Sequence, residues 1–355
     1  MKKAALLLSL TAAVLAGCHP DPNIITPAFT TKGVFVLSEG QFGAGDGAVS
    51  AFDNTSKTLV VDAFGAANSG SKLGDVVQDM GIVGTRGYVC VNGSRKVEVV
   101  SVPDFKSVAT IRRIEQPRYF AWNLGTRGYV TSWRGNYTGY LPGKVMVIDL
   151  NTNALIDSIT VGRCPEKPAT LNGSLYVPNS YDNTVSVIDM NTNKVTSTIT
   201  VADGPGTVVA DQTANLWVLC SGFTVYNTQA PYNVISSTPG TLARFAPGSP
   251  TNQLKLSFAS SGPSRLRISP DQTRLYYSYG KAEYQLSTTA TALPATPFIR
   301  RSFSGFGIDP ADNTIYAAVS PSYSTAGRFV RYPAAGGAAI DSFTVKVGPN
   351  GFVFY

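Results

Sequence analysis

Alternating apolar and polar residues that lead into an Asn- and Asp-rich turn recur along this chain. Residues 145–153 read Val-Met-Val-Ile-Asp-Leu-Asn-Thr-Asn, and residues 185–193 repeat this order 40 positions later as Val-Ser-Val-Ile-Asp-Met-Asn-Thr-Asn. Such alternation is typical of a half-buried β-strand, and Asn and Asp favour the following tight turn because they tolerate left-handed backbone and bond their own amides. The chain is therefore expected to repeat one unit built from β-strands.

This strand pattern recurs along the body of the chain at spacings of roughly 40 to 57 residues. Its seven occurrences are residues 49–53, 97–101, 145–149, 185–189, 242–245, 283–286 and 329–332. A strand rich in Tyr or Trp precedes most of them, and several units begin with a short strand entered by Gly or Pro. Units of this length with several strands are typical of propeller blades. We therefore expect an all-β fold, a seven-bladed β-propeller.

The two ends of the repeated region complement each other. Residues 34–37 form a strand of the second type with no innermost strand before it, and residues 348–355 form an innermost strand with no outer strands after it. Pairing the two removes the open edge that an unclosed ring would leave. The propeller is therefore predicted to be closed by pairing of its N- and C-terminal strands.

The first residues have the features of a secretory signal. Two lysines precede an apolar stretch at residues 4–16 that is too short to span a membrane, and the Leu-Ala-Gly-Cys segment ending at Cys18 resembles a bacterial lipobox. An ordinary cleaved signal with a chance cysteine is the alternative. We expect a signal peptide at residues 1–17, a lipidated Cys18 with a flexible stalk at residues 18–31, and the propeller at residues 32–355. This order predicts a cell-envelope lipoprotein of the outer membrane, on the cell surface or facing the periplasm.

Several segments resemble a known repeat family. Residues 129–133 (Tyr-Val-Thr-Ser-Trp), 176–180 (Tyr-Val-Pro-Asn-Ser) and 268–276 resemble the YVTN-type β-propeller repeat. Residues 33–43 also resemble the start of Bacteroidetes surface lipoprotein propellers, with Ser38 and Gln41 where those proteins usually have Asn. Some members of that group bind cobalamin and pass it to a TonB-dependent transporter. The resemblance thus implies a corrinoid-like ligand and a transporter partner in the outer membrane.

Composition supports a large β-body and limits its partners. Hydrophobic residues make up 43% of the chain and charged residues 14%, with 34 Gly and 22 Pro to supply turns. The net charge of +7 comes from Lys and Arg that are spread rather than clustered, so nucleic-acid binding is not expected. Besides Cys18 there are three cysteines, Cys90, Cys164 and Cys220, so at most one internal disulfide is possible. Buried free thiols are the favoured interpretation for Cys90 and Cys220.

The residue types needed for common catalytic sites are scarce. The one histidine, His19, lies on the stalk, which excludes Ser-His-Asp, Cys-His and His-ligated metal sites from the body. Most Asp residues occupy turn positions, and turn formation is favoured over calcium binding for Asp309 and Asp312 because no dense Asp ladder accompanies them. We expect no catalytic residues, no metal and no cofactor.

The loops after each second strand and before each innermost strand should open on one face of the ring. They are rich in Tyr, Trp, Arg and Asn, residue types that are enriched where a rigid surface holds a ligand. For any one of them, capping a blade is the alternative. The residues expected to bind a ligand are Glu39, Gln41, Phe42, Arg95, Arg118, Tyr119, Trp133, Arg134, Asn136, Tyr137, Tyr181, Phe223, Arg265, Tyr279, Lys281 and Tyr323. Further positions expected on this rim are Asn92, Glu166, Lys167, Asn179, Asp182, Tyr226 and Asn350.

Three functions fit these observations. The favoured hypothesis is a non-catalytic lipoprotein that binds a small polar ligand on the channel rim, for nutrient capture together with a TonB-dependent transporter. The second is a lactonase- or lyase-like propeller enzyme that uses Glu39, Glu166 or a rim Tyr with a captured metal. The third is a protein-interaction scaffold. Two long segments, around residues 133–140 and 223–241, are read as loops that carry rim residues.

Overall fold

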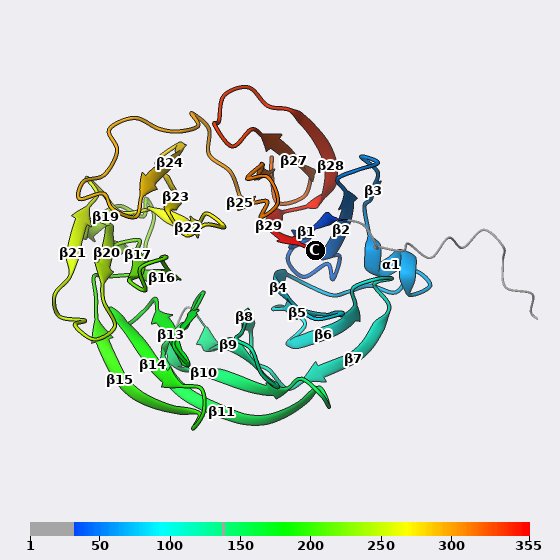
Figure 1. The fold of residues 1–355 in the computed structure, drawn as a ribbon, viewed down its shortest axis with the longest axis horizontal. Coiled ribbons are helices and arrows are strands. Elements are labelled where there is room, and N and C mark those ends of the chain that lie inside the picture. Colours follow the sequence, from blue (N-terminus) through cyan, green and yellow to red (C-terminus); the bar gives the residue numbers. More distant parts are fainter. Residues whose placement is uncertain (1–31, 137–138) are drawn as a thin grey trace, which may run out of the picture.

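The computed structural model describes residues 32–136 and 139–355, which form a ring of seven β-sheets around a central channel (Figure 1). The prediction of an all-β, seven-bladed propeller is confirmed. The expected signal peptide, Cys18 and the stalk lie outside the described residues, as does Tyr137. Across the described part, no helix is long and apolar enough to cross a membrane.

Each blade is an antiparallel sheet, and its strands are given below in order from the channel to the outside of the ring. Blade 1 contains β29 (Pro349–Phe354), β1 (Gly33–Ser38), β2 (Ala48–Asp53) and β3 (Leu59–Val60). Blade 2 contains β4 (Val77–Val83), β5 (Arg86–Val91), β6 (Lys96–Ser101) and β7 (Ser107–Arg112). Blade 3 contains β8 (Pro117–Trp122), β9 (Arg127–Asn136), β10 (Gly139–Asp149) and β11 (Ala154–Arg163). Blade 4 contains β12 (Ala169–Leu171), β13 (Ser174–Asn179), β14 (Thr184–Asp189) and β15 (Lys194–Thr200).

The remaining three blades complete the ring. Blade 5 contains β16 (Pro205–Ala210), β17 (Leu216–Cys220), β20 (Thr241–Phe245) and β21 (Leu254–Ser257). Blade 6 contains β22 (Ser264–Ile268), β23 (Arg274–Tyr279) and β24 (Ala282–Ser287). Blade 7 contains β25 (Gly305–Ile308), β26 (Ile315–Val319), β27 (Ala326–Tyr332) and β28 (Asp341–Val347). A separate hairpin of β18 (Thr224–Tyr226) and β19 (Val234–Ser237) lies between β17 and β20, and the short helix α1 (Ala63–Ala67) follows β3.

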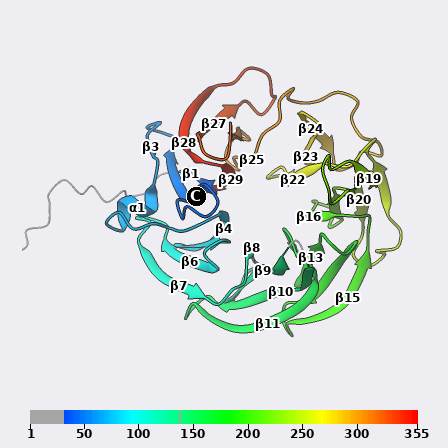
Figure 2. The ribbon, with the colours of Figure 1, turned by 180° about the vertical axis from the view of Figure 1, so that it is seen from behind.

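The ring is closed by strands from both ends of the chain, as predicted. β1 pairs with β29 in antiparallel register, with Val34 opposite Phe354 and Val36 opposite Phe352. Figure 2 shows the same closure from behind, with the C-terminus beside β1. The Phe35 and Tyr355 rings stack with centroids 4.3 Å apart. This pairing covers the inner edge of β1, which would otherwise be open.

The repeated Asn turns join blade 3 to blade 2 and blade 4 to blade 3. Asn153 and Asn193 adopt left-handed backbone, with φ of 57° and 56°. The Tyr88 hydroxyl of blade 2 lies 3.1 Å from Asn153 Oδ1 of blade 3, and the Tyr129 hydroxyl of blade 3 lies 3.2 Å from Asn193 Oδ1 of blade 4. The turn that the sequence pattern predicts is therefore also the acceptor for a tyrosine of the neighbouring blade.

The two long segments and blade 6 differ from the expected pattern. The segment at residues 223–241, expected as a loop, contains the β18–β19 hairpin, and the described residues 133–136 and 139–140 lengthen β9 and β10 as paired strands, with Tyr140 opposite Gly135. Blade 6 has three strands rather than four, because Pro294 and Pro297 lack the amide hydrogens that an outer strand would need.

Cys90, Cys164 and Cys220 are free and buried, as expected for Cys90 and Cys220.

Candidate ligand-binding site

A central cavity of about 410 Å³ opens where the inner strands begin, and all seven blades line it. In Figure 1 these inner strands, β4, β8, β16, β22, β25 and β29 among them, border the channel. The charged side chains that line the cavity are Glu39, Asp79, Arg118, Glu166, Lys167, Arg265 and Arg267. Four are cationic and three are anionic, so the lining has a surplus of one positive charge.

A β-bulge at the start of the inner strand turns side chains into the cavity. The register shifts between Val77 and Asp79 in β4, Pro117 and Phe120 in β8, Pro205 and Thr207 in β16, and Ser264 and Arg267 in β22. Such a bulge adds a residue to one strand and re-aims its side chain. The residues within these shifts that line the cavity are Gln78, Arg118, Tyr119, Gly206 and Arg265.

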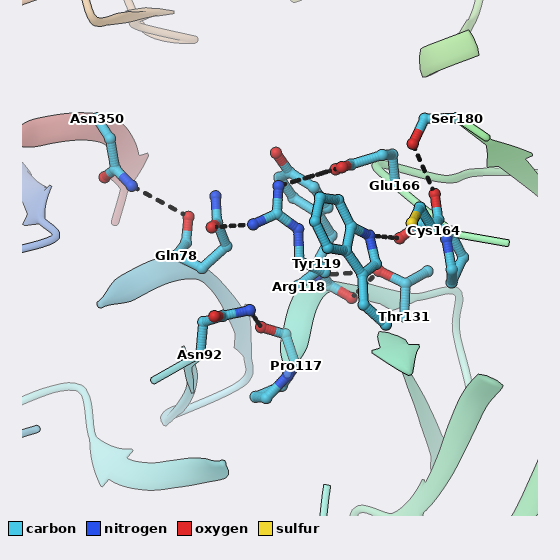
Figure 3. Close-up of polar contacts among 12 residues, drawn as sticks. Gln78, Asn92, Pro117, Arg118, Tyr119, Thr131, Cys164, Glu166, Ser180 and Asn350 are labelled. Atoms are coloured by element: carbon cyan, nitrogen blue, oxygen red, sulfur yellow. Dashed lines mark hydrogen bonds and ion pairs between the residues drawn. The ribbon is translucent and has the colours of Figure 1, made fainter. Parts of the chain in front are cut away.

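Arg118 is held in place by groups from three blades. Its Nη2 lies 3.1 and 3.2 Å from the two carboxylate oxygens of Glu166, and its Nη1 donates to Gln78 (Figure 3). The guanidinium also lies 4.3 Å from the centre of the Trp133 ring. Burial raises the pKa of Glu166, while the charge of Arg118 opposes that rise. The result is a rigid ion pair at the wall of the cavity.

Lys167 and Asp79 form a second ion pair beside Tyr119. Lys167 Nζ lies 3.5 Å from Asp79 Oδ1, and Asp79 Oδ2 accepts the Phe120 amide at 3.0 Å. Lys167 Nζ lies 5.4 Å from the centre of the Tyr119 ring. Burial lowers the pKa of Lys167, and burial together with the charge of Glu166 raises the pKa of Tyr119. The Tyr119 hydroxyl therefore stays protonated near neutral pH.

A row of aromatic side chains runs beside the cavity across blades 3, 4 and 5. Ring centroids lie 5.4 Å apart for Trp133 and Tyr140, 4.6 Å for Tyr140 and Tyr181, and 5.8 Å for Tyr181 and Phe223. Tyr181 and Phe223 line a side pocket that shares Ser180 and Gly204 with the central cavity. We call Trp133, Tyr140, Tyr181 and Phe223 the aromatic row. Its rings meet edge to face and give the cavity a partly apolar border.

The structure brings some of the expected ligand-binding residues together and separates others. Glu39, Arg118, Tyr119 and Arg265 line the cavity, as do the rim positions Glu166, Lys167 and Asn350. Trp133, Tyr181 and Phe223 belong to the aromatic row. Tyr323 lines another side pocket, which shares Glu39 and Arg265 with the cavity.

The other expected residues lie away from the cavity. Gln41 is exposed, Phe42 is 85% exposed, and Arg95 and Lys281 are exposed at turns. Arg134 lies 3.7 Å from Glu115, Asn136 is exposed at the hairpin tip, and the Tyr279 hydroxyl lies 2.9 Å from that of Ser260.

Sequence reasoning missed Gln78, Asp79, Ser264 and Arg267. One signal could have found part of this set. In five blades a proline marks the entry to the inner strand, and the residue after it lines the cavity. These residues are Arg118, Glu166, Gly206, Ser264 and Asn350.

The acidic residues considered for calcium serve turns. Asp309 Oδ1 accepts the Ala311 amide at 2.9 Å, and Asp312 Oδ1 accepts the Thr314 amide at 2.8 Å. Within residues 32–136 and 139–355, no three His, Cys, Asp or Glu side chains gather as a set of metal ligands.

Comparison with known proteins shows the family and the fold. A family model described as a domain of unknown function, DUF5074, matches residues 32–346. No curated protein sequence matches the chain.

Three solved structures illustrate the shared fold. A quinonprotein alcohol dehydrogenase-like protein from Bacteroides thetaiotaomicron is 15% identical, with a TM-score of 0.63 over 91% of this chain and 78% of that chain. The periplasmic gluconolactonase of Pseudomonas aeruginosa is 12% identical, with a TM-score of 0.60 over 90% of this chain and 99% of that chain. A functionally unknown protein from Desulfotomaculum acetoxidans is 12% identical, with a TM-score of 0.60 over 92% and 99%. At these identities the likeness shows the propeller fold alone.

Proposed function

Because this chain belongs to the DUF5074 family, whose description assigns no activity, we propose a function from the central cavity: the propeller is a non-catalytic protein that binds a small polar ligand there. The observation that carries the proposal is the convergence of charged and hydrogen-bonding side chains from seven blades on one recess of about 410 Å³. Ligand sites are concave, largely preformed and set with a few convergent polar groups. Rigid strands hold these groups, so little ordering is needed when a ligand binds.

The state of the acidic residues supports binding rather than proton transfer. Both oxygens of Glu166 accept from Arg118, Asp79 is engaged by Lys167 and an amide, and Glu39 Oε1 accepts from Asn350 at 3.1 Å. A general base needs an oxygen within reach of the proton that it removes. In this cavity the carboxylates instead orient cations and amides. Turnover of a sugar lactone by the purified protein would overturn the non-catalytic part of the proposal.

A corrinoid is the ligand that the resemblance of residues 33–43 suggests, with a TonB-dependent transporter as the partner. The aromatic row supports this choice, since an apolar part of the ligand could contact Tyr181 and Phe223 while its polar substituents enter the cavity. Co-purification of a transporter from native membranes tests the partner.

The same proposal places the protein on the outer membrane through lipid on Cys18. A Cys18→Ser variant should then leave the membrane fraction, and its retention there would contradict the anchor.

The cavity is tested by filling it. Gly206 lines the cavity, and a Cβ placed on it would meet no atom within 4 Å. We expect Gly206→Leu to weaken ligand binding at least about tenfold, because the new side chain occupies the ligand's space. The measurement is isothermal titration with cyanocobalamin and with a panel of small polar metabolites, both charged and neutral.

Gly248→Leu is the matched control, since a Cβ there also meets no atom within 4 Å and the residue lies outside the cavity. It should bind as the unsubstituted protein does, and both variants should keep the same melting temperature. Equal affinity of Gly206→Leu and the unsubstituted protein would remove the cavity as the site.

A further inference from the structure

Two arginines of β22 face the cavity without an acidic partner. Arg265 Nε donates to the Ser304 carbonyl at 2.9 Å, and its Nη1 lies 3.2 Å from Ser264 Oγ. Arg267 Nε donates to the Phe306 carbonyl at 3.2 Å, and its Nη1 to the Leu266 carbonyl at 2.9 Å. In the described residues, no carboxylate oxygen lies within 4.0 Å of either guanidinium. The other two cations of the cavity, Arg118 and Lys167, each have one.

The bonds that these arginines make leave donors free. A guanidinium carries five N–H donors, and the contacts above use only Nε and Nη1 of each residue. Among the described residues, Nη2 of Arg265 and Nη2 of Arg267 have no hydrogen-bond acceptor. The neutral carbonyls and the Ser264 hydroxyl fix the orientation of each guanidinium group but do not balance its positive charge.

The two positive charges of Arg265 and Arg267 lie close together and away from bulk water, which costs the folded state free energy. Burial lowers the pKa of Arg267 and repulsion by Arg265 adds to that effect, while the more distant charges of Asp79 and Glu283 oppose it. Arg265 also has a φ of 58°, a left-handed conformation that a non-glycine residue rarely adopts, so the backbone holds its side chain here at a cost. Buried charges in proteins are normally paired. A negative group between the two arginines would offset their repulsion and accept the free donors.

The neighbouring blade leaves room for such a group. Blade 5 presents no charged side chain to the cavity beside β22, and its lining residues are Gly204, Gly206, Thr207, Leu219 and Ser221. A Cβ placed on Gly206 would meet no atom within 4 Å. The acidic lining residues Glu39, Asp79 and Glu166 come from blades 1, 2 and 4. A ligand could therefore place its body against blade 5 and its charged end on blade 6.

We propose that the ligand of the central cavity carries an oxyanion, a carboxylate or phosphate group, that binds between Arg265 and Arg267. The inference rests on the proposed function and adds the chemical class of the ligand. Carboxylate and phosphate both match the arginine fork, which bonds two oxygens at once.

The test measures stabilisation by simple anions. The unsubstituted protein should melt at least about 2 °C higher in inorganic phosphate or in succinate than in chloride at equal ionic strength and pH, because a bound ligand stabilises the folded state. A response to phosphate alone identifies a phosphate group, and a response to succinate alone identifies a carboxylate. Failure of both anions to exceed chloride overturns the inference.

The double variant Arg265→Gln/Arg267→Gln assigns the effect to this pair. It should lose the anion response while its melting temperature in chloride stays equal or rises, since the repulsion between the two charges is gone. Arg300→Gln/Arg328→Gln is the control, because it removes the same charge from two exposed positions. An unchanged anion response in the Arg265→Gln/Arg267→Gln variant overturns the inference.

The outcome separates this inference from the proposed function. If a ligand of the titration panel binds the unsubstituted protein, is blocked by Gly206→Leu and is indifferent to the Arg265→Gln/Arg267→Gln change, the cavity is a binding site and the oxyanion inference fails. If Gly206→Leu has no effect on that ligand, the proposed function fails as well.

Discussion

Glu283 of β24 is a carboxyl group that the fold keeps almost fully from water, at 3% exposure. It accepts a hydrogen bond from Ser278 Oγ at 2.7 Å and from the Phe303 amide at 3.2 Å. Burial raises its pKa to about 7, although these hydrogen bonds and the charges of Arg265 and Arg267 act to lower it. Between its ordinary pKa and about 7, the folded protein keeps a proton on Glu283 that the unfolded chain releases.

This difference in pKa predicts a dependence of stability on pH. The contribution of Glu283 is fully present below its ordinary pKa and declines as the pH rises toward about 7, because the unfolded state then binds fewer protons than the native state. The loss is on the order of 3 kcal/mol. Glu283→Gln should abolish that slope, measured by urea unfolding at pH 5 and pH 7.5. Glu115→Gln, at a half-exposed position, should retain it. The same slope in Glu283→Gln would contradict the assignment.

At the same scale, sequence patterns locate part of the candidate binding site. Arg118, Glu166 and Asn350 follow prolines that mark the inner strands, so local chemistry identifies them. Gln78 and Arg267 carry no such mark, because their direction depends on β-bulges that shift the register. Phe42 and Lys281, at loop tips, are of residue types that often bind ligands, but both are exposed to solvent and lie outside the cavity. Residue type alone does not tell the wall of the cavity from its outer rim.

Between elements, a hydrogen bond from a tyrosine of one blade to an asparagine of a neighbouring blade recurs, as in Tyr88–Asn153 and Tyr129–Asn193. We call these contacts the Tyr–Asn seam. Tyr129 on β9 also lies 3.0 Å from the Met190 carbonyl, and Tyr316 on β26 donates to Asn54 of blade 1. The seam thus occurs at three blade boundaries of the described ring.

The seam predicts coupled losses of stability. Tyr129→Phe and Asn193→Gly should each lower the free energy of unfolding by about 1 kcal/mol, because each removes a partner of a largely buried hydrogen bond. Glycine is chosen at residue 193 because it accepts the left-handed backbone. Chemical denaturation of both single variants and the double variant should show coupling of about 0.5 kcal/mol or more. Fully additive losses would argue against the seam, and Tyr323→Phe, at a 93% exposed position, should change nothing.

The element pattern was predictable where apolar alternation was regular. All seven third strands were located by it, because one buried face imposes a period of two. Residues 133–140 and 223–241 are predicted as loops because they add more chain than a hairpin turn needs. Their described parts instead form strands by pairing with each other in hairpins.

For the whole molecule, closure by β29 holds the ring together. β29 packs Phe352 and Phe354 against Val34, Phe52 and Phe329 across two blades. Asn350 adds hydrogen bonds to Glu39 and to the Val77 carbonyl of blade 2. Blades 1, 2 and 7 therefore all depend on this one strand.

Deleting residues 349–355 should lower the melting temperature by more than about 5 °C, because burial worth several kcal/mol and a full strand pairing are lost. Differential scanning calorimetry measures the change. The control replaces residues 227–232, at the exposed tip of the β18–β19 hairpin, by a short Gly-Ser link and should melt as the unsubstituted protein does. An unchanged melting temperature after the deletion would contradict the closure.

Whole-molecule architecture was the part that sequence predicted best. Seven repeats and two complementary ends imply a ring, and the structure has it. The aromatic row and the β22 arginine pair were not foreseen as units. Each combines residues whose distances depend on how bulges and hairpins orient the side chains of several blades.

The pairing of β1 with β29 also sets an order of events during biosynthesis. A ribosome delivers the chain from its N-terminus, so β1 emerges more than 300 residues before the strand that covers its inner edge. Asn350 and Gly351 of that late strand form part of the cavity wall. A nascent or prematurely terminated chain thus exposes the unpaired inner edge of β1, which can pair with strands of other chains, and its cavity is incomplete. The proposed binding site is complete only after residues 349–354 have left the ribosome.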